Sequence, residues 1–159
     1  MKETLNFEKT CCFTGHRMIA AAAMPELKAQ LEKTLDDLLA RGVGRYICGG
    51  ALGFDTLAAQ TVLEKKREYP WIKLIIAAPC ADQSARWSEK QKKTYQEILD
   101  AADEVTVLFD RYVTGCMHFR DAFMVDHSDV LVAYYRGRPG GTQYTFLYAE
   151  SRGLEIINL

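Results

Sequence analysis

Two glycine-rich segments each stand directly before a sequence that favours a helix. The first holds Gly49, Gly50 and Gly53 and runs into Asp55, and the second is the Pro-Gly-Gly-Thr sequence at 139–142. Glycines let a backbone approach a phosphate closely, and the first turn of a helix offers unpaired N–H groups and a positive dipole end. A tight turn is the structural alternative for either segment alone. Two such segments at one edge of a sheet favour phosphate binding.

Three arginines have the chemistry to bind a phosphate or a carboxylate. A guanidinium donates a planar fork of hydrogen bonds, and Arg17, Arg120 and Arg136 occur just after predicted strands or on a helix that follows one. A solvated surface charge is the alternative for each of these arginines, and we favour it for a fourth candidate, Arg138. His16 lies in the turn after the first predicted strand, although a lone histidine is more often structural than catalytic.

These patterns define one predicted site for a nucleotide or a nucleotide-derived ligand. The predicted nucleotide- and phosphate-binding residues are Thr14, Gly15, His16, Arg17, Gly49, Gly50, Ala51, Gly53, Asp55, Pro79, Arg120, Arg136, Gly140, Gly141 and Thr142. Asp55 is also the candidate catalytic carboxylate, although capping of its helix explains it as well. Trp87, Tyr95 and Tyr112 could stack on a base or pack as half-buried aromatic residues.

The elements that must position these residues alternate between strands and helices. Strand-like sequences occur at 9–14, 45–48, 72–78, 104–109, 129–134 and 154–159. Helical patterns occupy 25–40, 55–66, a segment beginning near 88, 118–126 and 142–151. Ser88 and Gln91 have the spacing of a capping box at the start of the third helix.

This alternation predicts an α/β fold with a parallel sheet covered by helices on both faces. We expect a Rossmann-like, three-layer, doubly wound sheet of five to six strands. The expected strand order is about 3-2-1-4-5, with the sixth strand at an edge. We find no linker or internal repeat, so residues 1–159 are interpreted as a single domain of this type. The predicted site residues gather at the carboxyl ends of the strands.

Composition narrows the classes of function. The chain of 159 residues is 48% hydrophobic and 26% charged, as in a folded globular protein, and its net charge of −1 disfavours a broad nucleic-acid surface. Five cysteines without a Cys-x-x-Cys pair argue against a disulfide framework and a structural zinc site, and we expect no metal. The longest uncharged runs are too short to span a membrane, and residues 1–9 contain no apolar core of a leader. We therefore expect a cytoplasmic protein.

The phosphate-binding patterns differ from the two commonest nucleotide motifs. Neither a Gly-x-Gly-x-x-Gly sequence after the first strand nor a P-loop lysine motif is present in the sequence. Ordinary NAD binding and ATP hydrolysis are therefore disfavoured. We expect that no cofactor is required and that the ligand is itself derived from a nucleotide.

Three sequence blocks resemble the YpsA-like family. They are Cys-Phe-Thr-Gly-His-Arg at 12–17, Gly-Gly-Ala-Leu-Gly-Phe-Asp at 49–55, and Pro-Cys at 79–80 with Gln83 and Trp87. That family belongs to the SLOG superfamily of Rossmann-like domains, named for the SMF/DprA and LOG proteins. The resemblance implies binding of a nucleotide or a nucleotide-derived ligand. The superfamily also includes phosphoribohydrolases, sensors and DNA-binding proteins.

A comparison with the LOG-type phosphoribohydrolases tests the chemistry. Those enzymes carry Met-x-x-Arg, then Ser-Asp, then Pro-Gly-Gly-x-Gly-Thr-x-x-Glu. Residues 117–120 match the first part, 128–129 match the second, and 139–141 begin the third. The x-Gly pair is missing, and the position of the catalytic glutamate is Thr145. The resemblance therefore carries over the arginine and the phosphate loop but not the catalytic carboxylate.

These observations lead to a ranked set of functions. The first is binding of a ligand similar to ADP-ribose or a nucleoside phosphate, as a sensor or regulator. The alternative is a nucleotide N-glycosidase acting at the ribose C1′ carbon, with Asp55 as the carboxylate. A DprA-like module for single-stranded DNA ranks third because the sequence has no basic stripe. We also expect a homo-oligomer, because relatives of this architecture often self-associate.

Overall fold

The computed structural model describes residues 8–159, so most of the amino-terminal stretch in which we expect no leader lies outside the described residues. The strands are β1 (Lys9–Gly15), β2 (Val43–Cys48), β3 (Lys73–Ala78), β4 (Glu104–Val107), β5 (Val130–Tyr134) and β6 (Glu155–Asn158). The helices are α1 (Met24–Ala40), preceded by the short 3-10 helix η1 (Ala21–Ala23), α2 (Phe54–Glu68), α3 (Glu89–Ala101), α4 (Cys116–Asp126) and α5 (Gly141–Ser151).

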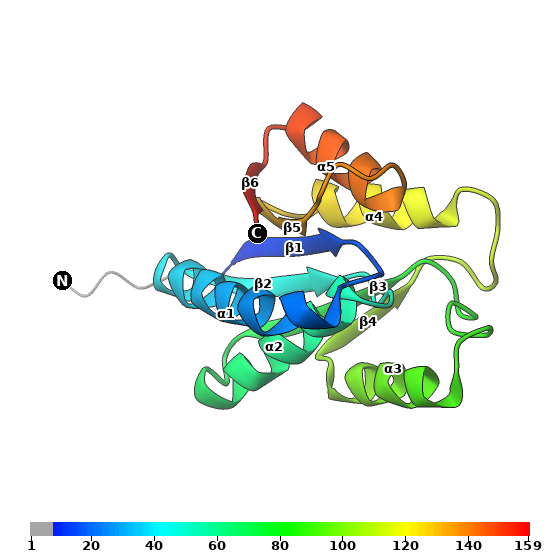
Figure 1. Cartoon of the computed structure of the whole chain (residues 1–159), viewed down its shortest axis with the longest axis horizontal. Coiled ribbons are helices and arrows are strands. Elements are labelled where there is room, and N and C mark those ends of the chain that lie inside the picture. Colours follow the sequence, from blue (N-terminus) through cyan, green and yellow to red (C-terminus); the bar gives the residue numbers. More distant parts are fainter. Residues whose placement is uncertain (1–7) are drawn as a thin grey trace.

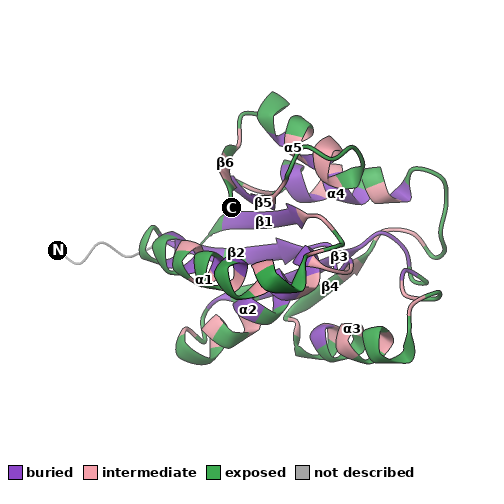
Figure 2. Ribbon diagram, in the orientation of Figure 1, coloured by how far each residue is buried: buried purple, intermediate pink, exposed green. Residues whose placement is uncertain are grey.

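The six strands form one parallel sheet between two layers of helices (Figure 1). Successive residues of a strand point to opposite faces, so each central strand contributes to both cores. Cys11 and Phe13 pack toward α1 and α2, whereas Cys12 packs toward α4 and α5. Figure 2 shows buried residues along the strands and exposed residues on the outer sides of the helices. The predicted three-layer α/β class is confirmed.

The predicted strand order is wrong at one position. The observed order is β4-β3-β2-β1-β5-β6, so β4 extends the sheet beyond β3, and β5 takes the place beside β1. The residues explain this arrangement. Val130, Leu131 and Val132 are buried, as expected for a strand covered on both faces. In β4, Val105 and Val107 are 43% and 48% exposed and alternate with polar residues, a pattern suited to an edge.

The position of β5 creates a switch point beside β1. From β1 the chain builds the sheet outward through β2, β3 and β4, and it then returns to place β5 on the other side of β1. Connections that leave β1 and β5 at their carboxyl ends therefore diverge to opposite faces of the sheet. This divergence opens a crevice where ligands bind in sheets of this kind.

Two helix starts matter for the site. The capping box predicted for α3 is present, because the Ser88 side chain accepts from the Gln91 N–H and the Gln91 side chain accepts from the Ser88 N–H. Helix α4 begins at Cys116, two residues before the predicted start, after Gly115 with φ 84°. The extra residues bring Met117 onto the helix. In the described part of the chain, no helix is both long and apolar enough to cross a membrane.

Candidate functional site

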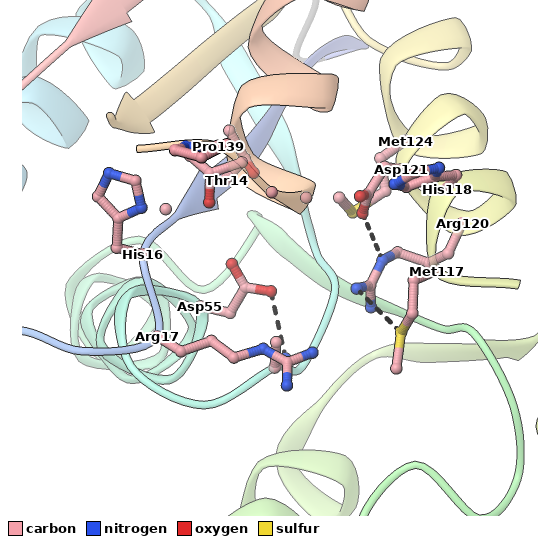
Figure 3. Close-up of a pocket in the computed structure, with 15 residues that line it drawn as sticks. Thr14, His16, Arg17, Asp55, Met117, His118, Arg120, Asp121, Met124 and Pro139 are labelled. Atoms are coloured by element: carbon pink, nitrogen blue, oxygen red, sulfur yellow. Dashed lines mark hydrogen bonds and ion pairs between the residues drawn. The ribbon is translucent and has the colours of Figure 1, made fainter. Parts of the chain in front are cut away.

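A pocket of about 350 Å³ lies at the switch point (Figure 3). Its walls come from the turn after β1, the segment between β2 and α2, the inner face of α4 and the loop before α5. The lining residues are Thr14, Gly15, His16, Arg17, Ala51, Asp55, Met117, His118, Arg120, Asp121, Met124, Pro139, Gly140, Gly141 and Thr142. Ten of these belong to the predicted set, so the structure brings most of the predicted residues into one cavity. We call it the switch-point pocket.

The turn after β1 is held by backbone contacts on both sides. The N–H of His16 donates to Tyr134 at 3.3 Å, and the His16 carbonyl accepts from the Phe54 N–H at 3.2 Å. Gly15 is required by packing, because a Cβ there would lie 2.4 Å from the side chain of Phe54. The turn thereby joins β5 to the start of α2.

The imidazole of His16 is held at the rim of the pocket by a hydrogen bond to the backbone. Its Nε2 accepts a hydrogen bond from the Arg136 N–H at 2.9 Å, which assigns the proton of the neutral ring to Nδ1. Burial lowers the pKa of His16, and the charges of Arg138 and Arg136 lower it further. His16 is therefore best suited to act near neutral pH as an uncharged donor through Nδ1.

The first glycine segment packs against protein groups. Gly50 and Gly53 have φ values of 72° and 79°, and a Cβ on Gly53 would lie 2.2 Å from the carbonyl oxygen of Arg17. A Cβ on Gly49 would lie 2.6 Å from the guanidinium of Arg120. These three glycines do not line the switch-point pocket, and their predicted role as ligand contacts stays a prediction. They let the backbone pass close to two arginines, and only Ala51 of this segment reaches the cavity.

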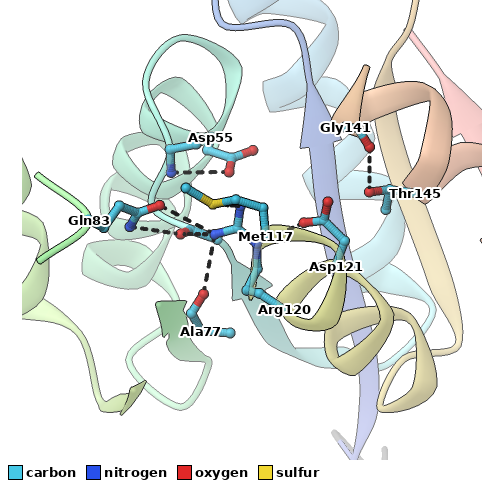
Figure 4. A network of polar contacts seen from close by, with 10 residues as sticks. Asp55, Ala77, Gln83, Met117, Arg120, Asp121, Gly141 and Thr145 are labelled. Atoms are coloured by element: carbon cyan, nitrogen blue, oxygen red, sulfur yellow. Dashed lines mark hydrogen bonds and ion pairs between the residues drawn. The ribbon is translucent and has the colours of Figure 1, made fainter. Parts of the chain in front are cut away.

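Arg120 is buried at the floor of the pocket, with only 4% of its surface exposed (Figure 4). Its Nη1 donates to the Gly49 carbonyl at 2.6 Å, and its Nε donates to Asp121 at 2.7 Å. Its Nη2 has a weak contact with the sulfur of Met117 at 3.8 Å. The prediction of a free clamp therefore needs correction: Arg120 chiefly joins α4 to the loop after β2, and only Nη2 lacks a strong acceptor among the described residues.

Two carboxylates share the pocket. Asp55 lies in the first turn of α2, but its Oδ2 accepts from the Ala51 N–H at 3.2 Å rather than capping the helix. Asp121 on α4 uses Oδ1 to accept from Arg120, and its Oδ2 lies close to Gly141, 3.7 Å from the position that a Cβ there would take. Burial raises the pKa of Asp55 to about 6; Arg120 opposes this effect, and the charge of Asp121 adds to it. A proton is therefore available on Asp55 close to neutral pH.

The loop before α5 presents free backbone donors. Gly140 has φ 136° and precedes the helix without any side-chain cap, and the first backbone bond of the helix runs from Tyr144 to the Gly140 carbonyl. The N–H groups of Gly141 and Thr142 are therefore uncapped at the positive end of the helix dipole. Both residues line the pocket. Thr145 is buried and donates its hydroxyl to the Gly141 carbonyl at 2.9 Å, which tightens this first turn.

Two further predicted residues lie outside the switch-point pocket. Arg136 is exposed and places its guanidinium 4.5 Å from the ring centre of Tyr134, so its side chain covers an aromatic ring at the surface. Pro79 is buried at the end of β3. The ligand contact that we predicted for each of them stays a prediction.

Sequence reasoning missed five lining residues, namely Met117, His118, Asp121, Met124 and Pro139. Met117, Asp121 and Met124 recur at intervals of four and three residues, which places them on one face of α4. The predicted helix start at residue 118 leaves Met117 outside the helix and hides this periodicity. Among residues 8–159, no three His, Cys, Asp or Glu side chains come together in a way that could hold a metal ion.

A Rossmann-like sheet with a polar pocket at its switch point is the class that this fold and site define. The model of the YpsA family, described as a SLOG family, matches residues 13–154. The chain therefore belongs to the YpsA family of SLOG proteins.

Two proteins of similar sequence agree with this assignment. The SPbeta prophage-derived protein YoqJ of Bacillus subtilis strain 168 is 36% identical over 140 residues, which cover 80% of this chain and 82% of YoqJ. A UPF0398 protein of Halalkalibacterium halodurans is 32% identical over 129 residues, 79% of this chain and 68% of that protein.

Two DNA processing proteins share the fold at low identity. DNA processing protein A of Helicobacter pylori, a structure concerned with single-stranded DNA binding, matches with a TM-score of 0.67 at 19% identity. The match covers 98% of this chain and 67% of that chain. The corresponding protein of Streptococcus pneumoniae matches with a TM-score of 0.66 at 13% identity, covering 93% of this chain and 49% of that one.

Proposed function

We propose that the protein binds a nucleotide or a nucleotide-derived ligand, of the ADP-ribose or nucleoside phosphate type, and acts as a sensor or regulator. The observation that carries the proposal is the uncapped start of α5, which opens into a polar pocket between β1 and β5. A phosphate there accepts from the N–H groups of Gly141 and Thr142 and lies at the positive end of the helix dipole. The exposed Arg17 supplies a cation at the opposite wall.

The carboxylates suit the sugar of such a ligand. Asp55 has Oδ1 and Asp121 has Oδ2 without a protein donor among the described residues, and both atoms belong to pocket-lining side chains. A carboxylate oxygen accepts hydrogen bonds from ribose hydroxyls, as acidic residues do in other Rossmann-like sites. The volume of about 350 Å³ lies at the lower end of the range of small-molecule sites and fits a phosphoribosyl group.

Calorimetry with AMP, ADP-ribose, NAD and a cyclic dinucleotide tests the proposal. We expect at least one of these ligands to bind, and we expect Gly141→Ala to weaken its binding about tenfold by placing a methyl group beside the phosphate. A Cβ on Gly141 would lie 3.7 Å from Asp121, an ordinary contact, so this variant is expected to fold. Gln143→Ala in the same helical turn lies outside the pocket lining and serves as the control. The absence of binding by all four ligands would overturn the proposal.

The second candidate function is hydrolysis of a nucleotide N-glycosidic bond. The observation that favours it is that two carboxylates, Asp55 and Asp121, line one pocket, although the LOG glutamate position is Thr145. In this reaction Asp121 takes a proton from water as the water oxygen bonds to C1′. The bond from C1′ to the base nitrogen breaks with its electron pair on the base, which receives a proton from Asp55.

Release of ribose 5-phosphate from a nucleoside monophosphate panel decides between the two candidates. The hydrolase candidate requires release by the wild-type protein and its loss in both Asp55→Asn and Asp121→Asn. Binding without release supports the sensor. Release that survives both substitutions would contradict the assigned carboxylates.

Single-stranded DNA belongs in the same binding screen. The Helicobacter pylori neighbour is described for its binding of single-stranded DNA, and its low identity makes the likeness one of fold alone. The net charge of −1 still leads us to expect weak, strongly salt-dependent binding of DNA by this chain. Micromolar affinity for single-stranded DNA at physiological salt would contradict that expectation and make nucleic acid the favoured ligand class.

A further inference from the structure

A second pocket of about 590 Å³ adjoins the switch-point pocket. It lies between the segment after β3 and the connection from β4 to α4, and it shares Arg17 and Met117 with the switch-point pocket. The two shared side chains come from opposite walls. A ligand that passes between them therefore reaches both cavities. We call this second cavity the aromatic pocket because Trp87 and Tyr112 both line it.

The two aromatic residues of this pocket differ in how they are held. Trp87 is half-buried and meets Tyr95 edge-on, with ring centres 5.2 Å apart, while the Tyr95 hydroxyl accepts from Gln83 at 3.1 Å. The ring of Trp87 is thereby supported from behind. Tyr112 is 59% exposed, and its backbone N–H donates to Asp82 at 2.9 Å. Both rings line one cavity, and aromatic rings of this kind stack on a planar group.

The charge at the junction of the pockets favours a phosphate between them. Arg17 is exposed and lines both cavities, and no side-chain hydrogen bond of Arg17 occurs in the described part of the chain. Arg86 adds a second exposed cation to the lining of the aromatic pocket. Phosphate bound at the start of α5 or at Arg17 would hold a base close to the aromatic rings.

We propose that the aromatic pocket binds the base of the ligand, stacked between Trp87 and Tyr112, while the ribose and phosphate occupy the switch-point pocket. The inference rests on the proposed nucleotide binding and narrows the substrate class. The ligand is a base-bearing nucleotide that extends past Arg17, rather than a free sugar phosphate. Base stacking on aromatic side chains is strong enough to change affinity about tenfold or more.

Fluorescence tests this placement directly because the chain has only two tryptophans. Trp71 lies between α2 and β3, is 52% exposed and lines neither pocket. The variant Trp71→Phe leaves Trp87 as the sole indole, and Trp87→Phe is its matched control. Titration of Trp71→Phe with AMP and ADP-ribose is expected to quench its emission, whereas emission of Trp87→Phe is expected to stay constant.

Calorimetry separates the two pockets. We expect AMP or ADP-ribose to bind at least tenfold more tightly than ribose 5-phosphate. Tyr112→Ala is expected to remove that difference while leaving the affinity for ribose 5-phosphate within about twofold. Thr94→Ala is the control, because Thr94 lines a neighbouring groove that also contains Trp87 but does not line the aromatic pocket.

The outcomes distinguish this inference from the proposed function. If the base-bearing ligands bind but the emission of Trp71→Phe is not quenched, the aromatic pocket is not the base site. The same holds if Tyr112→Ala still binds AMP or ADP-ribose at least tenfold more tightly than ribose 5-phosphate. Nucleotide binding itself still stands in both cases. If a loss of affinity follows Thr94→Ala instead, the base lies in the neighbouring groove and the inference is wrong. If no probe binds, the proposed function itself fails.

Discussion

The glycines at this site act mainly by allowing other parts of the chain to approach closely. Gly53 is the clearest example, because its backbone has φ 79° and its Cα faces the carbonyl of Arg17. No other residue type fits there without moving the turn that follows β1. Its importance could be suspected from the glycine-rich pattern, but the pattern was interpreted as a phosphate contact. Only the fold shows that the close approach is between two parts of the chain itself.

Replacement of Gly53 by Ala should therefore destabilise the protein strongly. The methyl group would lie 2.2 Å from a backbone oxygen, and the left-handed conformation adds a cost of about 1–2 kcal/mol. We expect a total loss of at least about 3 kcal/mol in the free energy of unfolding. Gly137→Ala is the matched control, since Gly137 has φ 82° but nothing within 4 Å of an added Cβ. Equal losses in urea denaturation of the two variants would contradict the proposed steric role.

Asp55 should make stability fall as pH rises from about 4 to 6. Burial raises the folded-state pKa of Asp55 to about 6, above the value of 3.8 for a free side chain. The folded state therefore retains a proton that the unfolded state has lost, and this contribution is present below pH 4 and gone above pH 6. Relative to the wild type, the free energy of unfolding of Asp55→Asn should rise by up to about 3 kcal/mol between pH 4 and pH 8.

Asp103 supplies a control of opposite sign for the same unfolding experiment. Burial raises the pKa of Asp103, but hydrogen bonds from Lys66 and the Leu74 N–H outweigh this effect and lower it overall. The contribution of Asp103 is thus present at neutral pH and lost on acidification. Parallel pH profiles for Asp55→Asn and Asp103→Asn would contradict both assignments.

At the scale of elements, the periodicities predicted all six strands and five helices, with boundaries within a few residues. Strand order was harder, because the right-handed crossover rule allows β4 on either side of the sheet. The polarity of the two strands distinguishes the edge strand from the central one. In β4, Glu104 and Thr106 alternate with valines, whereas residues 130–133 of β5 are continuously apolar. Weighing that contrast would have placed β5 in the centre. Met117 is a separate case, since it falls on the helix only because α4 starts at Cys116, before the predicted residue 118.

The start of α3 gives a prediction at this scale. The reciprocal bonds of Ser88 and Gln91 satisfy two backbone N–H groups that the helix cannot pair by itself. Ser88→Ala should lower the free energy of unfolding by about 1 kcal/mol. Thr94→Ala should change it by less than about 0.5 kcal/mol, because Thr94 lies inside the helix and bonds only to the Lys90 carbonyl. Thermal denaturation of both variants checks the difference.

For the molecule as a whole, folding buries the thiols, three of them in the two cores and the other two, Cys80 and Cys116, beyond the carboxyl ends of the strands. All five cysteines are free and buried, and none exceeds 1% exposure. Burial raises the pKa of Cys12 and Cys80 to about 12, and contacts of Cys80 with Asp82 and Cys116 act in the same direction. Their thiols therefore remain protonated at pH 8.

Thiol titration should reflect this enclosure. A coloured disulfide reagent at pH 8 is expected to modify less than about one thiol per native chain within minutes, and five thiols in denaturant. Any slow native reaction should come from Cys80, which lines the aromatic pocket, and Cys80→Ala should remove it. Rapid modification of two or more thiols in the native protein would show that a core opens readily.

The placement of β5 beside β1 also divides the switch-point pocket between two stretches of chain. Residues 14–55 supply one wall and residues 117–142 supply the other, and the exposed residues 110–115 belong to the connection between these two stretches (Figure 1). A break in that connection yields two fragments, of which the first keeps six of the lining residues and the second keeps nine. Because a ligand in the pocket contacts both walls, it would stabilise the reassembled fragments over the separate ones.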